Sequence, residues 1–115
     1  MWRLHRKPSL YDLCCELEIP TPPTVPCVNP ENLESQLSAL QFPVLLKLPT
    51  SNNSIGREYC DSMPELIERF QLLEARESQR FSASPFGQQK ILGKAIYTLM
   101  LWHEGRKLGE VIYRP

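Results

Sequence analysis

The chain has 115 residues, which is enough for one small domain or for part of a larger one. Its 42% hydrophobic and 23% charged residues are typical of a globular protein and argue against a disordered tail. Lysine plus arginine and aspartate plus glutamate both number 13, so no basic excess indicates nucleic-acid binding.

The cysteines and the N-terminus indicate a reducing, cytoplasmic setting. None of the four cysteines forms a Cys-x-x-Cys pair or stands at zinc-ligand spacing from a histidine, so we expect reduced structural thiols. No apolar segment follows the basic N-terminus as it would in a signal peptide. No run approaches the roughly 18 apolar residues of a membrane span, so we expect no membrane association.

The N-terminal third predicts a helix followed by a proline-rich linker. Apolar side chains recur at i, i+3, i+4 and i+7 within residues 9–18 and form one stripe: Leu10, Leu13, Cys14 and Leu17. Ser9 can cap this helix, with Asp12 as the acid of a capping box. The four prolines of residues 19–26 cannot continue the helix and favour an extended path.

A short helix and a buried strand follow the linker. Asn29 is a typical N-cap, Pro30 suits the first turn, and Glu31 faces the positive end of the helix. The apolar face of this helix is expected to comprise three leucines, Leu33, Leu37 and Leu40. Residues 42–48 are rich in valine and leucine and predict a buried strand, interrupted by Lys47.

A polar loop, a returning strand and a longer helix come next. Residues 50–56 (TSNNSIG) favour a turn, and residues 57–60 can return as the second strand of a hairpin. Ser62 and Glu65 form a capping box that opens a helix over residues 62–76. Its apolar face is predicted to be Met63, Leu66, Ile67, Phe70 and Leu73.

The remaining residues predict a loop and three strands. Residues 77–86 are polar and favour a loop, and residues 87–92 predict a strand that breaks at a glycine. Residues 95–102 and 108–113 predict a hairpin around a turn at 103–107. The mixture of helices and strands predicts an α+β fold.

Lys47 is the first candidate for binding chemistry. Along a strand it points to the face opposite Leu46 and Leu48. From a rigid strand it can serve as a point charge for a phosphate, or it can be an ordinary lysine on a half-exposed sheet. The small and polar residues 51–56 can present backbone N–H groups to an anion. The same loop is compatible with an ordinary hairpin tip.

Several segments, in this order, resemble the first half of an ATP-grasp domain. They are IPTPPT at residues 19–24, FPVLLK at 42–47, SIG at 54–56 and the helix at 62–70. The resemblance covers about residues 7–113.

The resemblance implies a division of the chain into three parts. Residues 1–41 would be a helical linker region with a proline-rich segment. Residues 42–92 would form the small, lid-like β-β-α-β subdomain of the ATP-grasp fold. Residues 93–115 would be the first hairpin of the larger subdomain.

The resemblance also implies which residues contact ATP phosphates. Lys47 matches the strand lysine of the family, and Lys7 resembles a second phosphate-binding lysine. The loop that folds over the phosphates corresponds to Ser51, Asn53, Ser54 and Gly56. This loop is poorer in glycine than is usual in the family, although asparagine tolerates positive φ better than most residues.

A third set of residues resembles the strand that reads the adenine ring in the family. It comprises Gln88, Gln89, Lys90, Ile91 and Leu92. Two registers remain open, with either Gln88 or Gln89 as the side chain that faces the pocket, because a slip of one residue exchanges the two faces of a strand. An ordinary strand with exposed glutamines is the alternative.

The implied function is the ATP-binding portion of a ligase that joins a carboxylate to an amine or a thiol. Its cofactors would be ATP and Mg²⁺, with the magnesium ligands outside this chain, because no matching carboxylates are identifiable here. We therefore expect a fragment that is not catalytically competent alone, completed by a C-terminal half or by a split partner chain. The alternative is a small, non-catalytic α+β interaction module that pairs its C-terminal strand edge with a partner.

Overall fold

The computed structural model describes residues 2–26, 28–50, 56–81 and 84–115. Four short strands form one antiparallel sheet in the order β1-β4-β2-β3. They are β1 (Thr24–Val25), β2 (Val44–Lys47), β3 (Arg57–Cys60) and β4 (Phe86–Gln89). A separate hairpin comprises β5 (Tyr97–His103) and β6 (Arg106–Tyr113). The combination of helices and antiparallel sheets confirms the α+β class.

One face of the four-stranded sheet carries the core. The 3-10 helix η1 (Pro30–Asn32), α3 (Leu33–Leu37) and α4 (Met63–Phe81) supply most of the covering side chains. The buried cluster consists of Val28, Leu33, Leu37, Leu40, Val44, Leu46, Leu48, Cys60, Leu66, Phe70, Leu73 and Phe86. Gly87 lets α3 approach the sheet, because a Cβ there would lie 2.6 Å from Cδ2 of Leu37.

The helix α4 begins where the capping box predicts. The backbone N–H of Glu65 donates to Oγ of Ser62 at 3.4 Å, and the Glu65 carboxylate accepts from the backbone N–H of Asp61 at 2.8 Å. The predicted face is confirmed, with Leu66, Phe70 and Leu73 buried and its other two members packed against the core. The predicted end was wrong, because the helix continues through residues expected to be a loop and ends at Phe81.

The N-terminal helices differ from the prediction. A short α1 (Trp2–His5) precedes α2 (Lys7–Glu16), so Ser9 lies inside a helix and is not its cap. Arg6 occupies the N-cap position without a side-chain cap, and a proline fills the first turn. The predicted apolar stripe is only partly buried, since Leu10 and Leu17 remain exposed.

The proline-rich segment is more than a linker. Thr24 and Val25 form β1, which pairs with Gln88 and Gly87 of β4. Residues 28–40 also contribute to the buried cluster. The core therefore extends across residue 41, where the sequence suggested a boundary, because the short strands need the leucines of α3 to bury their face.

The β2–β3 hairpin depends on Gly56. Its φ is +68°, in the left-handed region that glycine adopts at no steric cost. A Cβ at this position would lie 2.1 Å from Cδ1 of Leu48. The Gly56 carbonyl accepts from the backbone N–H of Leu48 at 3.1 Å and closes the loop.

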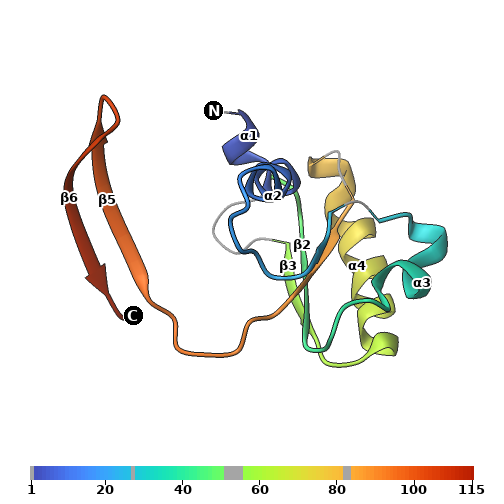
Figure 1. The fold of residues 1–115 in the computed structure, drawn as a ribbon. Helices are drawn as coiled ribbons and strands as arrows, with labels where there is room; N and C mark the ends of the chain where they lie inside the picture. The colour runs from blue at the N-terminus through green and yellow to red at the C-terminus, as the bar shows by residue number, and fades with distance from the viewer. Residues whose placement is uncertain (1, 27, 51–55, 82–83) are drawn as a thin grey trace.

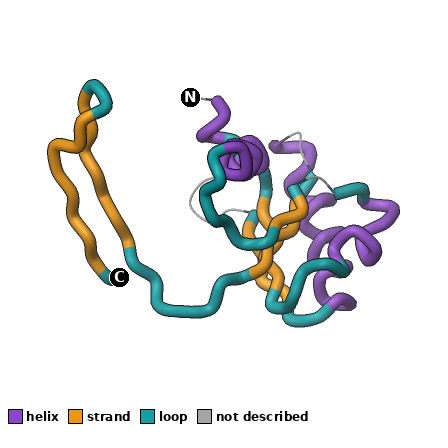
Figure 2. Tube along the Cα trace, in the orientation of Figure 1, coloured by secondary structure: helices purple, strands orange, loops and turns teal. Residues whose placement is uncertain are grey.

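The β5–β6 hairpin stands away from the helix-covered sheet (Figures 1 and 2). Glu104 and Gly105 form its two-residue turn with φ of +47° and +75°, a tighter turn than the predicted five residues. Every residue from 90 to 115 is exposed. The radius of gyration is 15.7 Å, whereas a compact chain of this length has about 13 Å.

Candidate functional site

The second face of the sheet carries the candidate site. Residues directly opposite one another in antiparallel strands share a face. Lys47 pairs with Arg57 of β3 and with Phe86 of β4, and the neighbouring Leu45 pairs with Tyr59 and Gln88. By this register all six side chains share the second face of the sheet. Phe86 also belongs to the buried cluster, whereas the other five lie outside it.

A cavity of about 340 Å³ separates this face from α2. It is lined by Lys7, Leu10, Tyr11, Cys14, Thr21, Pro22, Lys47, Phe86 and Gln88. The volume lies at the lower end of the roughly 300–1,000 Å³ typical of ligand pockets. Two lysines in an otherwise uncharged lining suit an anionic group of modest size, and none of these described lining residues is acidic.

A chain of hydrogen bonds positions Lys47. Its Nζ donates to Oε1 of Gln88 at 2.6 Å, and Nε2 of Gln88 donates to Oγ1 of Thr24 at 2.9 Å. The Thr24 hydroxyl in turn donates to the carbonyl of Pro22 at 2.7 Å. This chain fixes the Gln88 amide with its oxygen toward Lys47. The ammonium group has three donors, and one of them is used here.

Lys7 reaches the same cavity from a distant part of the sequence. Its backbone N–H donates to the carbonyl of Pro49 at 2.9 Å, which joins the start of α2 to the end of β2. Because Pro49 lies two residues after Lys47, this bond brings both lysines to one end of the cavity.

Both lysines have lowered pKa values. Burial lowers the pKa of Lys7. Burial has the largest effect on Lys47 as well, and the positive charges of Lys7 and Arg57 lower its pKa further. The protein therefore holds these cations together at a cost that a bound anion would offset.

The five residues that were expected to read the adenine ring do not lie on one face of the sheet. Gln88 faces the cavity, whereas Gln89 lies on the opposite face and its Oε1 accepts from the backbone N–H of Gln41 at 3.0 Å. The strand ends at Gln89 and not at residue 92. Ile91 and Leu92 are exposed in the segment that leads to the hairpin.

The remaining candidates are Lys90 and the loop residues. Lys90 is exposed, and its ammonium lies 4.8 Å from the ring centroid of Tyr59. Gly56 shapes the hairpin, as described above. Ser51, Asn53 and Ser54 lie outside the described residues.

The residues at this site that were not predicted from the sequence include Thr24, Arg57 and Tyr59. Thr24 supports Gln88 through β1, a strand that the prolines concealed. Arg57 and Tyr59 could have been found from the hairpin itself, because a strand that returns from the loop places residues opposite Lys47 and Leu45.

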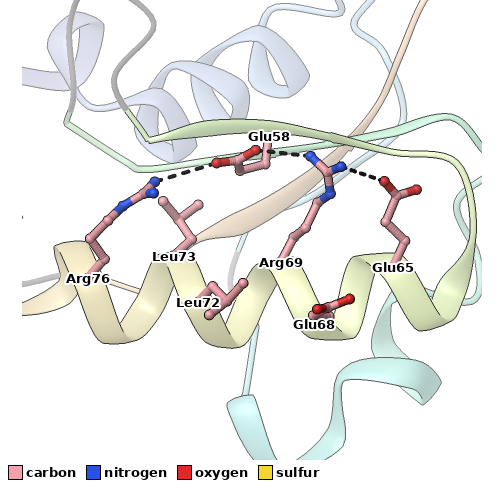
Figure 3. Close-up of a pocket in the computed structure, with 7 residues that line it drawn as sticks. All are labelled: Glu58, Glu65, Glu68, Arg69, Leu72, Leu73 and Arg76. Atoms are coloured by element: carbon pink, nitrogen blue, oxygen red, sulfur yellow. Dashed lines mark hydrogen bonds and ion pairs between the residues drawn. The ribbon is translucent and has the colours of Figure 1, made fainter.

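A second groove of about 330 Å³ runs between β3 and α4 (Figure 3). The carboxylate of Glu58 forms ion pairs with Arg69 at 3.2 Å and with Arg76 at 3.5 Å. Arg69 also forms an ion pair with Glu65 at 2.7 Å. Its arginines are thus neutralised within the protein. These half-exposed pairs contribute little individually, and they join the edge strand to the helix.

Metal ligands are not grouped in the part of the chain that the structure describes. No set of three or more histidine, cysteine, aspartate or glutamate side chains there could hold a metal ion. The lysine-lined cavity fits phosphate oxygens, but the described residues do not fit Mg²⁺. None of the described helices is long and apolar enough to cross a membrane.

Comparison with known proteins adds no relative. No family model matches this chain, and no curated protein gives a significant match.

Proposed function

We propose that the cavity between α2 and the sheet binds the phosphates of ATP. The observation that carries the proposal is the convergence of Lys7 and Lys47, forty residues apart, at one cavity with no acidic lining residue among those described. Lysine is a common phosphate ligand, and partly desolvated lysines bind anions more strongly than exposed ones do.

We also propose that residues 42–89 correspond to the lid subdomain of an ATP-grasp fold. The order β2, β3, α4, β4 matches the β-β-α-β order that the resemblance implies. In this assignment Lys47 and Lys7 hold phosphate oxygens. Of the residues that resemble the adenine strand, Gln88 would face the adenine ring, because its side chain lines the cavity.

The proposed role is binding, without catalysis by these 115 residues alone. An ATP-grasp ligase needs Mg²⁺ to neutralise phosphate charge during acyl-phosphate formation. In this assignment the metal ligands, the acid substrate and the nucleophile are held by residues outside this chain or by a partner chain, in the cytoplasm. No catalytic step is assigned to residues of this chain.

Titration calorimetry with ATP, with and without magnesium, tests the proposal. We expect Lys47→Ala to weaken ATP binding at least about ten-fold, since hydrogen bonds to charged groups contribute about 1.5–3 kcal/mol. Lys94→Ala is the matched control, because Lys94 is exposed in the segment before the hairpin. Wild-type protein that binds no ATP, or equal losses in both variants, would contradict the proposal.

The exposed β5–β6 hairpin favours a second candidate function, a protein-interaction module. Cross-strand pairs place an uninterrupted non-polar face on it: Tyr97, Leu99, Leu101, Gly109, Val111 and Tyr113. A two-stranded hairpin is only marginally stable alone, so a partner that buries this non-polar face would stabilise it. If partner binding is lost in Leu99→Lys and unchanged in Lys47→Ala, and ATP does not bind, this second function replaces the first.

A further inference from the structure

Arg57 is a third cation at the lysine site. It stands directly opposite Lys47 in the β2–β3 pairing, where side chains are about 5 Å apart at their Cβ atoms. Like charges directly opposite each other on neighbouring strands are destabilising. The same face also receives Lys7 from α2 across the cavity.

The strand β3 separates its charges between the two faces of the sheet. Glu58 points to the core side, where it pairs with Arg69 and Arg76 of α4 (Figure 3). Arg57, the adjacent residue, points to the cavity side. The positions of β2, β3 and β4 that share this side with it include no acid: Leu45, Lys47, Tyr59, Phe86 and Gln88.

Tyr59 holds the Arg57 guanidinium on this face. The Cζ atom of Arg57 lies 5.6 Å from the Tyr59 ring centroid, within the range of a cation–π contact. Such a contact leaves the planar N–H donors of the guanidinium available at its edge. A guanidinium can donate two parallel hydrogen bonds to a phosphate, which a lysine cannot do.

We propose that Arg57 is a phosphate-binding residue and that the cluster of Lys7, Lys47 and Arg57 recognises a polyphosphate chain. The inference rests on the proposed ATP site and extends it. Recognition is through the number of phosphates, so a triphosphate binds more tightly than a diphosphate, and a diphosphate more tightly than a monophosphate. The mutual repulsion of the three cations, which helps to lower the pKa of Lys47, is relieved by a ligand with several negative charges.

Calorimetric titration of the full chain with ATP, ADP, AMP and inorganic tripolyphosphate tests this inference. Affinity should fall from ATP to AMP, and tripolyphosphate should compete with ATP. Arg57→Ala should weaken tripolyphosphate binding about ten-fold or more. Arg106→Ala, a change at the exposed first residue of β6, should leave it unchanged. Arg57→Lys retains the charge, and its affinity for tripolyphosphate should lie between those of Arg57→Ala and wild type. If circular dichroism shows that Arg57→Ala does not fold, the affinity of Arg57→Lys relative to wild type is the test.

The failures of the two proposals are distinguishable. ATP binding that requires Lys47 but is unaffected at Arg57 would overturn this inference and leave the ATP site intact. Binding of ATP and AMP with equal affinity would overturn it as well. Arg57-dependent binding of tripolyphosphate without any binding of ATP would support the inference and contradict the proposed nucleotide function.

Discussion

The helix-covered sheet and the β5–β6 hairpin use the same strand chemistry with different outcomes. In the sheet, alternate residues of β2 such as Val44 and Leu46 are fully buried beneath α3 and α4. In the hairpin, comparable residues such as Leu99 and Val111 lie open on a longer antiparallel ladder, which has one register shift between Leu101 and Trp102. The difference indicates that cross-strand pairing defines the shape of a hairpin, whereas burial beneath helices supplies most of the stability.

The hairpin still has local stabilising contacts. The rings of Tyr97 and Tyr113 stack with centroids 5.5 Å apart at its open end. Lys107 and Glu110 form an ion pair at 3.0 Å near its turn. The tyrosine contact joins the two strands, and the ion pair lies within β6. Both contacts are exposed and lie within the hairpin, so they cannot couple it to the unfolding of the sheet.

The largest expected effect comes from Phe70→Ala in α4. Phe70 is fully buried, so its truncation should lower the free energy of unfolding by about 3–5 kcal/mol. Leu99→Ala, at a position that is 68% exposed, should change it by less than about 0.5 kcal/mol. Urea denaturation followed by circular dichroism at the helical signal measures both. Equal losses would show that the hairpin contributes to the same core.

Glycine substitutions provide a sharper comparison of the two regions. Gly56 and Gly105 have similar positive φ values, but Leu48 crowds a Cβ at Gly56 and nothing lies within 4 Å of one at Gly105. Gly56→Ala should therefore cost about 2–4 kcal/mol of global stability, combining left-handed strain with overpacking. Gly105→Ala should cost about 1 kcal/mol and only within the hairpin.

The same denaturation experiment reports the cost at Gly56. Amide hydrogen exchange resolves the local effect at Gly105, because it detects opening of the hairpin without unfolding of the sheet. A shift of the global transition by Gly105→Ala would contradict the independence of the two regions.

The sequence predicted the elements whose signals are local. The cap at Asn29 accepts from the backbone N–H of Glu31, and β2, β3 and the core face of α4 lie where their patterns indicate. The strand β1 was not predicted, because two residues among prolines have no periodicity and are fixed only by pairing with β4. The extension of α4 to Phe81 was also missed, since its polar residues carry no apolar repeat.

The candidate site could be predicted only in part for the same reason. Lys47 was apparent as a charge within an apolar strand, and the loop was apparent as a polar turn able to present N–H groups to an anion. Lys7 followed from the resemblance. The choice between Gln88 and Gln89 depends on the register of β4 against β2, which is a tertiary property. The hydrogen bond from Lys47 to Gln88 joins residues 41 positions apart, and no local pattern encodes it.

The smallest expected effect distinguishes a desolvated lysine of the sheet from an exposed one of the hairpin. The pKa of Lys47 lies below its ordinary value of 10.5 in the folded protein. Between the folded and unfolded pKa values, the unfolded chain binds more protons, so this residue makes the free energy of unfolding rise with pH. Below the folded pKa its destabilising effect is present in full. Lys47→Met should remove that effect at pH 7 and lose the hydrogen bond to Gln88, which contributes about 1 kcal/mol.

The pH dependence separates the two contributions in Lys47→Met. The loss of the hydrogen bond lowers the stability of the variant by a similar amount at every pH. The relief of the desolvated charge is largest near pH 7 and disappears as wild-type Lys47 loses its proton at higher pH. The stability of Lys47→Met relative to wild type should therefore be highest near pH 7 and should decline as pH rises toward 10.5. Lys7 and Tyr11, the other lining residues with shifted pKa values, are present in both proteins, so their contributions largely cancel in the stability difference.

Lys107→Met is the matched control in the hairpin, because Lys107 is exposed and pairs with Glu110. Its free energy of unfolding should differ from that of wild type by no more than about 0.5 kcal/mol, because exposed ion pairs contribute little to global stability. Urea denaturation at several pH values, with reducing agent present, measures all three proteins. If the free energy of unfolding of Lys47→Met relative to wild type were constant between pH 7 and 10.5, Lys47 would be solvated as freely as Lys107. The sheet face would then lack the desolvated cation on which the proposed phosphate site depends.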